Sequence, residues 1–182
     1  NANLEDILHA CEQDVQKLIG RKDVSLDLCS KIENGKLRVD QGVIAGCAGG
    51  LYDSIYEAAS ILKGHTGGCG DYALSVYPGS QPIMMELVRT GVISDLMASG
   101  ATIRTAFCGP CFGAGDVPAN GALSIRHTTR NFPSREGSKP GNGQLSGVAL
   151  MDARSIAATT ANGGILTPAT DIDYDPTVPE YQ

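Results

Sequence analysis

Apolar segments of strand length alternate with helix-forming segments along most of this chain. A strand that is joined to the next one through a helix re-enters the sheet from the same edge, so the two strands run parallel. The alternation therefore predicts an α/β domain with a mainly parallel sheet flanked by helices.

The boundaries of the expected elements follow from apolar periodicity and capping residues. Asp152 is expected to cap the last helix, and Asn162 with the two glycines after it is expected to end that helix. The pattern predicts helices over residues 4–19, 51–64, 82–91, 92–100 and 153–161. It predicts strands, some of which run into a loop or turn, over residues 24–32, 42–50, 72–80, 102–107, 123–130 and 147–151.

The length of the chain fits one domain. Its 182 residues, 42% of them hydrophobic, suffice for one core, and we expect a single α/β domain over residues 1–182. The chain begins with Asn1-Ala2, and residues 169–182 are acidic, contain proline and are typical of a linker. These ends predict a domain excised from a larger multidomain protein.

Charge and composition exclude several classes of function. A net charge of -6 disfavours nucleic-acid binding, which needs a cationic surface. The sequence has no run of eighteen apolar residues and no basic segment followed by an apolar one, so we expect neither a membrane span nor a signal peptide. Six cysteines in an acidic chain of this size do not resemble a secreted disulfide scaffold. We expect a protein of the reducing cytoplasm.

Cys108 and Cys111 stand two residues apart in the stretch FCGPCFGAGD, residues 107–116. Thiol–disulfide exchange proteins use the same spacing, with the first cysteine at the start of a helix that lowers its pKa. Glycines, a proline and Asn-Gly follow Cys111 and disfavour a helix there, and the chain has no tryptophan, which thioredoxins usually carry before the motif. A redox pair and two loop cysteines without function are the alternatives to a metal site.

Cys47 offers a third thiol in a separate glycine-rich loop. Ligands of α/β sheets bind beyond the C-terminal ends of the strands, and Cys47, Cys108 and Arg130 all follow predicted strands. Three thiolates at this edge would suit an iron–sulfur cluster or zinc. They would also leave one coordination position open, as a Lewis-acid catalyst requires.

Four segments in this order resemble the aconitase family of iron–sulfur hydro-lyases: RVDQGVIAGCAGGLYDSIYEAA (38–59), YPGS (77–80), CGPCFG (108–113) and TTRNFPSR (128–135). The similarity runs from about Arg38 to about Pro168. It implies a three-layer fold like that of the aconitase domains. It also implies that Cys47, Cys108 and Cys111 hold a [4Fe-4S] cluster, whose fourth iron binds the hydroxyl and carboxylate of a hydroxy acid.

The resemblance also assigns Arg130 and Arg135 to the substrate carboxylates. A planar guanidinium binds a carboxylate through two parallel hydrogen bonds, which fixes its orientation as well as its charge. Without the resemblance, two solvated loop arginines would be the favoured interpretation. Asn131, between them, is expected to orient the loop or the surroundings of the cluster.

The chain departs from the family at two places. The family commonly has Ser-Cys-Thr-Asn around the first ligand, where this chain has Gly46-Cys47-Ala48-Gly49. The residue before Arg130 is commonly Asn and is Thr129 here. These changes leave the cluster ligands in place and alter groups near the substrate, so we expect a divergent hydratase branch.

The other cysteines and histidines are predicted to be structural. Cys11 and Cys29 lie on predicted regular elements and are expected to be core thiols. His65 and Cys69 share a glycine-rich loop, and His127 is expected to be a packed or solvated side chain. Tyr77 begins a turn that is expected at a strand end near the cleft.

These observations lead to one preferred function. The resemblance predicts the cluster-bearing domain of an aconitase-like hydratase acting on a hydroxy polycarboxylate. No segment matches the family's acid–base residues, so the remaining domains of the parent hydratase are the expected partners, and the isolated chain is expected to be inactive and to lose its cluster in air. Alternatives are a non-catalytic iron-sensing or binding domain, to which RNA binding would belong, and a thiol-redox domain.

Overall fold

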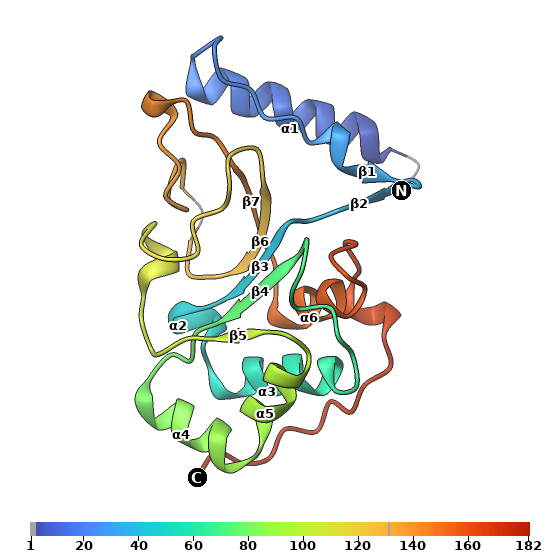
Figure 1. The fold of residues 1–182 in the computed structure, drawn as a ribbon, viewed down its shortest axis with the longest axis vertical. Coiled ribbons are helices and arrows are strands. Elements are labelled where there is room, and N and C mark those ends of the chain that lie inside the picture. The colour runs from blue at the N-terminus through green and yellow to red at the C-terminus, as the bar shows by residue number, and fades with distance from the viewer. Residues whose placement is uncertain (1–2, 131) are drawn as a thin grey trace.

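A five-stranded parallel sheet forms the centre of the computed structural model, which describes residues 3–130 and 132–182 (Figure 1). The strand order is β5–β4–β3–β6–β7, and each neighbouring pair is parallel. This sheet confirms the predicted α/β class. The strands are β3 (Gln41–Ile44), β4 (Ala73–Val76), β5 (Thr102–Ile103), β6 (Leu123–His127) and β7 (Gly147–Leu150).

Two of the helices, α4 (Gln81–Arg89) and α6 (Ala153–Ala161), begin at a side-chain cap. The Ser80 hydroxyl accepts the N–H of Ile83, and the Asp152 carboxylate accepts the N–H groups of Arg154 and Ser155. The helices are α1 (Leu4–Ile19), α2 (Gly46–Gly49), α3 (Tyr52–Leu62), α4 (Gln81–Arg89), α5 (Val92–Ala98) and α6 (Ala153–Ala161). Short 3-10 turns are η1 (Cys29–Lys31), η2 (Gly109–Cys111), η3 (Pro140–Asn142) and η4 (Ala169–Asp171).

Helices cover one face of the sheet. In Figure 1, α3, α5 and α6 lie together on one side of the strands, and α3 packs directly on α6. Strand residues that point to this side join the helices in the main core; they include Ile44, Leu74 and Ile125. Burial of these side chains gives the fold its main driving force.

The opposite face of the sheet is largely polar. Gln41, Ser75, Ser124 and Arg126 point to it, beside a small apolar group made by Val43, Ala45 and Tyr77. Residues 104–122 cross this face and hydrogen-bond to it, so the third layer consists of loop rather than helix. This loop carries Cys108 and Cys111.

Several boundaries differ from the sequence prediction. Residues 24–28 form no strand, although Val24, Leu26 and Leu28 are buried in alternation. Their backbone does not join a ladder; instead, the Glu12 carboxylate accepts the N–H of Leu28 at 2.5 Å. The alternating pattern thus indicated which side chains are buried but not their backbone partners.

A short hairpin was not foreseen. Strands β1 (Ile32–Glu33) and β2 (Lys36–Leu37) pair antiparallel around Asn34 and Gly35, both of which have positive φ. Asn-Gly is a strong signal for this kind of turn. The predicted strand over 102–107 contains only the two residues of β5, and the expected loop after β3 contains the single helical turn α2.

The C-terminal segment lies against the domain. Residues 172–182 have no helix or strand, and Figure 1 shows them running along the helical side. Ile172, Tyr174 and Val178 pack against the core, and the Tyr181 ring meets the Tyr52 ring at 5.4 Å. Among the described residues, none of the helices has the length and hydropathy that a membrane crossing requires.

Candidate cluster site

The cysteine-bearing loops meet at the topological switch point of the sheet. From β3 the chain adds β4 and β5 on one side and then returns to place β6 and β7 on the other. The chain therefore leaves β3 and β6 toward opposite sides of the sheet, and ligands of α/β sheets bind in the crevice between two such loops. Cys47 follows β3, and Thr129 follows β6.

Two of the predicted ligands converge on one hydroxyl. Cys47 Sγ lies 3.4 Å from Thr129 Oγ1, and Cys111 Sγ lies 3.8 Å from the same oxygen. Cys108 is exposed and belongs to the same turn as Cys111, whose N–H donates to the Cys108 carbonyl at 3.1 Å. Within residues 3–130 and 132–182 every cysteine is free.

The glycines around Cys47 are required by close contacts. Gly46 has φ +73°, and a Cβ there would lie 2.6 Å from Cys111 Sγ. A Cβ at Gly49 would lie 2.2 Å from the carbonyl oxygen of His127. The departures at Gly46 and Gly49 therefore match this backbone, because a larger residue at either position would push the loop off β6 or off Cys111.

Arg126 fixes the loop that carries the CxxC pair. Its side chain is 2% exposed and points from β6 into the polar face. Nη1 donates to the Pro110 carbonyl at 3.1 Å, and Nη2 donates to the Asp116 carbonyl at 2.6 Å. Gln41 Oε1 and Ser124 Oγ accept further bonds from the same guanidinium, at 3.1 and 3.0 Å. The residue directly before Cys111 is thus held against the sheet.

The charge of Arg126 is opposed by burial and supported by neighbouring acids. Burial lowers the pKa of Arg126, and the negative charges of Glu136 and Asp116 raise it again. Glu136 is itself buried and accepts the Ser146 hydroxyl at 3.0 Å. Arg126 was not among the predicted site residues; its signal in the sequence is a lone arginine inside the apolar strand pattern LSIRH.

Asp116 ties the same loop to β4. Its carboxylate accepts the Tyr77 hydroxyl at 2.5 Å and the Ser75 hydroxyl at 3.0 Å, and it pairs with Arg104 at 3.4 Å. Burial, and then the hydrogen bond and charge of Asp116, raise the pKa of Tyr77 to about 12. Tyr77 therefore stays protonated at neutral pH and donates its hydrogen bond to the loop.

Of the two predicted substrate arginines, Arg135 contacts the CxxC turn. Arg135 Nε donates to the Cys111 carbonyl at 2.5 Å, and its guanidinium lies over the Phe132 ring, 5.5 Å from the centroid. Arg130 is exposed and directly follows Thr129. Asn131 lies outside the described residues.

His127 has a structural contact. Its Nδ1 accepts the N–H of Ala153 at 3.1 Å, which places the ring proton on Nε2 and caps the start of α6. Burial lowers the pKa of His127 below its ordinary value. The ring is half-buried and packed, as predicted.

The cysteines outside the candidate site differ in burial. The prediction for Cys11 was wrong, because its side chain is exposed on the outer side of α1. Cys29 is half-buried and packs against the core. His65 and Cys69 are both exposed.

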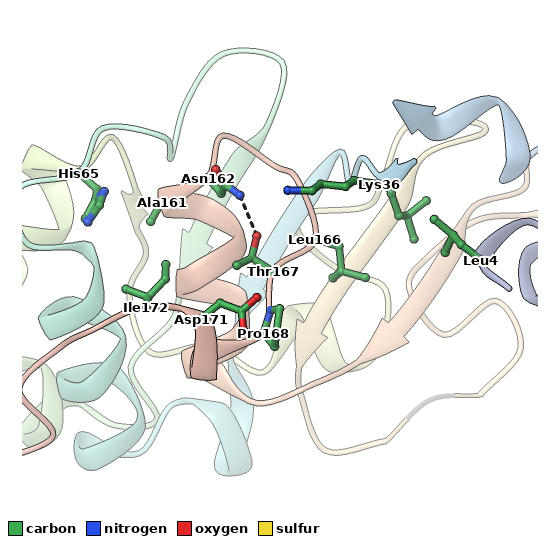
Figure 2. Close-up of a pocket in the computed structure, with 11 residues that line it drawn as sticks. Leu4, Lys36, His65, Ala161, Asn162, Leu166, Thr167, Pro168, Asp171 and Ile172 are labelled. Carbon is green, nitrogen blue, oxygen red and sulfur yellow. Dashed lines mark hydrogen bonds between the residues drawn. The ribbon is translucent and has the colours of Figure 1, made fainter. Parts of the chain in front are cut away.

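A separate cavity of about 620 Å³ lies toward the N-terminal ends of the strands, away from the cysteines. Helix α6 begins beside the end of β6, where the Ala153 N–H donates to His127. The helix runs back toward the start of β3, where the Gly164 carbonyl accepts the Val39 N–H. Figure 2 shows the cavity beyond the C-terminal end of α6, with Lys36, Asn162 and Thr167 on its wall. Ligands of parallel sheets bind at the opposite edge, so we place the functional site at the cysteines rather than here.

Comparisons with known proteins define the class of this chain. Its sequence matches the profile of the aconitase family (aconitate hydratase) over residues 3–158. The chain belongs to the aconitase family.

Relatives include large subunits of 3-isopropylmalate dehydratase. The one from Thermoanaerobacter pseudethanolicus is 36% identical over 129 residues, which are 69% of this chain and 30% of that protein. The one from Mycolicibacterium smegmatis is 34% identical over 140 residues, 76% of this chain and 32% of that protein. The chain thus spans about a third of the length of these relatives.

Proposed function

We propose that this chain is the cluster-bearing part of a hydratase that adds or removes water across a hydroxy polycarboxylate. The observation that carries the proposal is the convergence of Cys47 Sγ and Cys111 Sγ on the Thr129 hydroxyl, with Cys108 on the adjoining turn. The donor set fits an iron–sulfur cluster, because thiolates are its usual ligands and Gly46 keeps the space beside Cys111 free of a side chain.

Cys47, Cys108 and Cys111 would hold a [4Fe-4S] cluster. When bound, a cluster with one iron free of protein ligands supplies a Lewis acid that polarises the departing hydroxyl. The chain's own residues do the rest: Arg126 and Asp116 hold the CxxC loop on the sheet, and the Thr129 hydroxyl contacts two of the thiols. Arg130 and Arg135 would bind and orient the substrate carboxylates through paired N–H donors.

The proton alpha to a carboxylate needs a base from outside this chain. His127, the histidine nearest the site in sequence, has its Nδ1 occupied by the Ala153 N–H. The length of the relatives leaves about two thirds of a large subunit to supply such a group. We therefore infer a composite site, completed by further domains of the parent protein.

Exposed aromatic side chains support this inference. Phe107 and Phe112 flank the CxxC pair and meet edge to face, and Phe132 lies under Arg135. They are the only three phenylalanines of the chain, and each is about half exposed. Apolar surface of this kind is usually covered in an assembly. We propose that the rest of the hydratase packs on it and excludes water from the cluster.

Activity of the parent protein tests the proposal. The anaerobically reconstituted protein would be given isopropylmalate, citrate, isocitrate and 2-methylcitrate in turn, with the unsaturated product followed by ultraviolet absorption. We expect turnover of at least one of them, abolished by Cys108→Ser and retained by Cys69→Ser. Arg135→Lys should raise KM more than it lowers kcat, because it loses paired binding of a carboxylate. A reconstituted parent protein that converts none of these acids would argue against the proposal.

A further inference from the structure

A second group of metal-binding side chains lies on α1 and η1, away from the cysteine loops. His9 and Glu12 stand three residues apart on α1, and Cys29 begins η1. One ligand atom from each lies within 4.8 Å of the other two. Figure 1 shows α1 apart from helices α3 to α6, at the end of the molecule where the chain begins. None of these residues takes part in the proposed hydratase chemistry.

Glu12 is held by the backbone on its far side. Its Oε1 accepts the N–H groups of Leu28 and Cys29, at 2.5 and 2.9 Å, which leaves Oε2 directed at His9. This carboxylate is 19% exposed, so its rotamer is fixed by packing as well as by hydrogen bonds. The same bond from Cys29 sets the position of the thiol relative to the carboxylate.

His9 is oriented from two sides. Its Nδ1 lies 3.1 Å from Glu12 Oε2, and its Nε2 lies 4.0 Å from Glu5 Oε1. A metal-binding histidine usually donates its other ring N–H to a carboxylate. With the proton on Nε2 toward Glu5, the unprotonated Nδ1 would offer its lone pair to a metal on the side of Glu12 and Cys29.

The electrostatic surroundings favour a cation. The charges that act on the Cys29 thiol are those of Glu12, Glu5 and Asp27, all negative. Thiol, imidazole and carboxylate together are the ligands of zinc, whereas magnesium and calcium prefer oxygen alone. A divalent cation would neutralise this acidic cluster and accept one donor from each side chain.

We propose that His9, Glu12 and Cys29 form a zinc site that fastens α1 to the segment carrying η1. Three protein ligands leave a fourth position for water, and Glu5 would orient the imidazole from outside. The ion would join α1 to η1, because two of its ligands lie on α1 and the third begins η1. The zinc ion would cross-link residues that are far apart in the unfolded chain, and it would stabilise the fold through its binding energy.

Zinc binding tests this directly and independently of the proposed hydratase. The background is the protein with Cys47, Cys108 and Cys111 all changed to Ser, which removes the thiols of the proposed cluster site. Competition with a chromophoric chelator should show one equivalent of Zn²⁺, bound about 100-fold or more weakly after Cys29→Ser or His9→Ala. Glu5→Gln, which alters only the outer partner, should cost about 10- to 100-fold. Cys11→Ser and His65→Ala are the matched controls and should change nothing.

Cobalt identifies the ligand. Co²⁺ in the site should give a thiolate charge-transfer band that Cys29→Ser abolishes and Cys11→Ser retains. The same pair of variants would also be compared with Cys47, Cys108 and Cys111 intact, where Cys29→Ser should remove one equivalent of bound metal relative to Cys11→Ser. A metal content that Cys29→Ser leaves unchanged in both backgrounds would overturn the proposal.

Discussion

Replacing Arg126 with Met should loosen the loop that carries the CxxC pair. Methionine is shorter and has no donors, so the Pro110 carbonyl loses the N–H group that now reaches it, whereas the Asp116 carbonyl keeps the Gln41 amide N–H at 3.1 Å. A buried acceptor left without a donor costs about 1–3 kcal/mol. Removing a buried charge recovers part of its desolvation cost. We expect the free energy of unfolding to fall by about 2 kcal/mol.

Chemical denaturation measures the total, and hydrogen exchange locates it. The amides of Cys111, Phe112 and Ala114 are bonded within the turn after Cys108 and should exchange about 10- to 100-fold faster in Arg126→Met. Amides of α6 should lose protection only through the global change in stability. Arg126→Lys keeps the charge without the planar fork and should lie in between.

A matched control separates the buried arginine from an exposed one. Arg154 is 46% exposed and pairs with Asp152 and Glu57, so Arg154→Met should cost no more than about 1 kcal/mol. If Arg126→Met unfolded at the same denaturant concentration as the wild type, with the turn amides still protected, Arg126 would not be what holds this loop.

Three further outcomes follow. Gly49→Ala should destabilise the fold by about 2 kcal/mol or more, because its Cβ would meet the His127 carbonyl, whereas Gly141→Ala, with nothing within 4 Å, should be neutral in the same denaturation assay. The raised pKa of Tyr77 stabilises the folded state. This contribution is complete below the unfolded pKa of about 10 and should disappear as pH rises through about 12. Tyr77→Phe should flatten that part of the stability–pH curve, and an unchanged curve would refute the assignment. The isolated chain should lose its cluster during purification in air and show no hydratase activity after anaerobic reconstitution; turnover without the other domains would place a base within this chain.

Local signals predicted much of the fold. The helix over 4–19 was predicted to its exact ends, and Asp152 caps α6 as expected, because both features depend on residues close in sequence. The glycines after Cys111 indicated correctly that no α-helix starts there, and η2 is a single 3-10 turn. The family resemblance selected the three cysteines. The loop after β5 reaches Cys47 because it crosses the polar face of the sheet, where Arg126 holds it.

Contacts between distant segments were beyond the sequence. Nothing local to Leu28 shows that Glu12 will accept its N–H, and this bond replaces the strand expected over 24–32. The alternation of Gln41, Ser75 and Arg126 onto a polar face became visible only when the strands were in register. The exposed thiol of Cys11 shows that a position on an amphipathic helix does not by itself decide burial.

Cluster assembly on single-cysteine variants would show directly whether Cys47, Cys108 and Cys111 hold the cluster. The protein would be reconstituted anaerobically with iron and sulfide and then analysed for both, with the cluster identified by its electron paramagnetic resonance after reduction. We expect about four irons and four sulfides per wild-type chain, loss of the intact cluster in Cys47→Ser, Cys108→Ser and Cys111→Ser, and retention in Cys69→Ser. A complete [4Fe-4S] cluster in the Cys47→Ser variant would contradict the assignment of the convergent site.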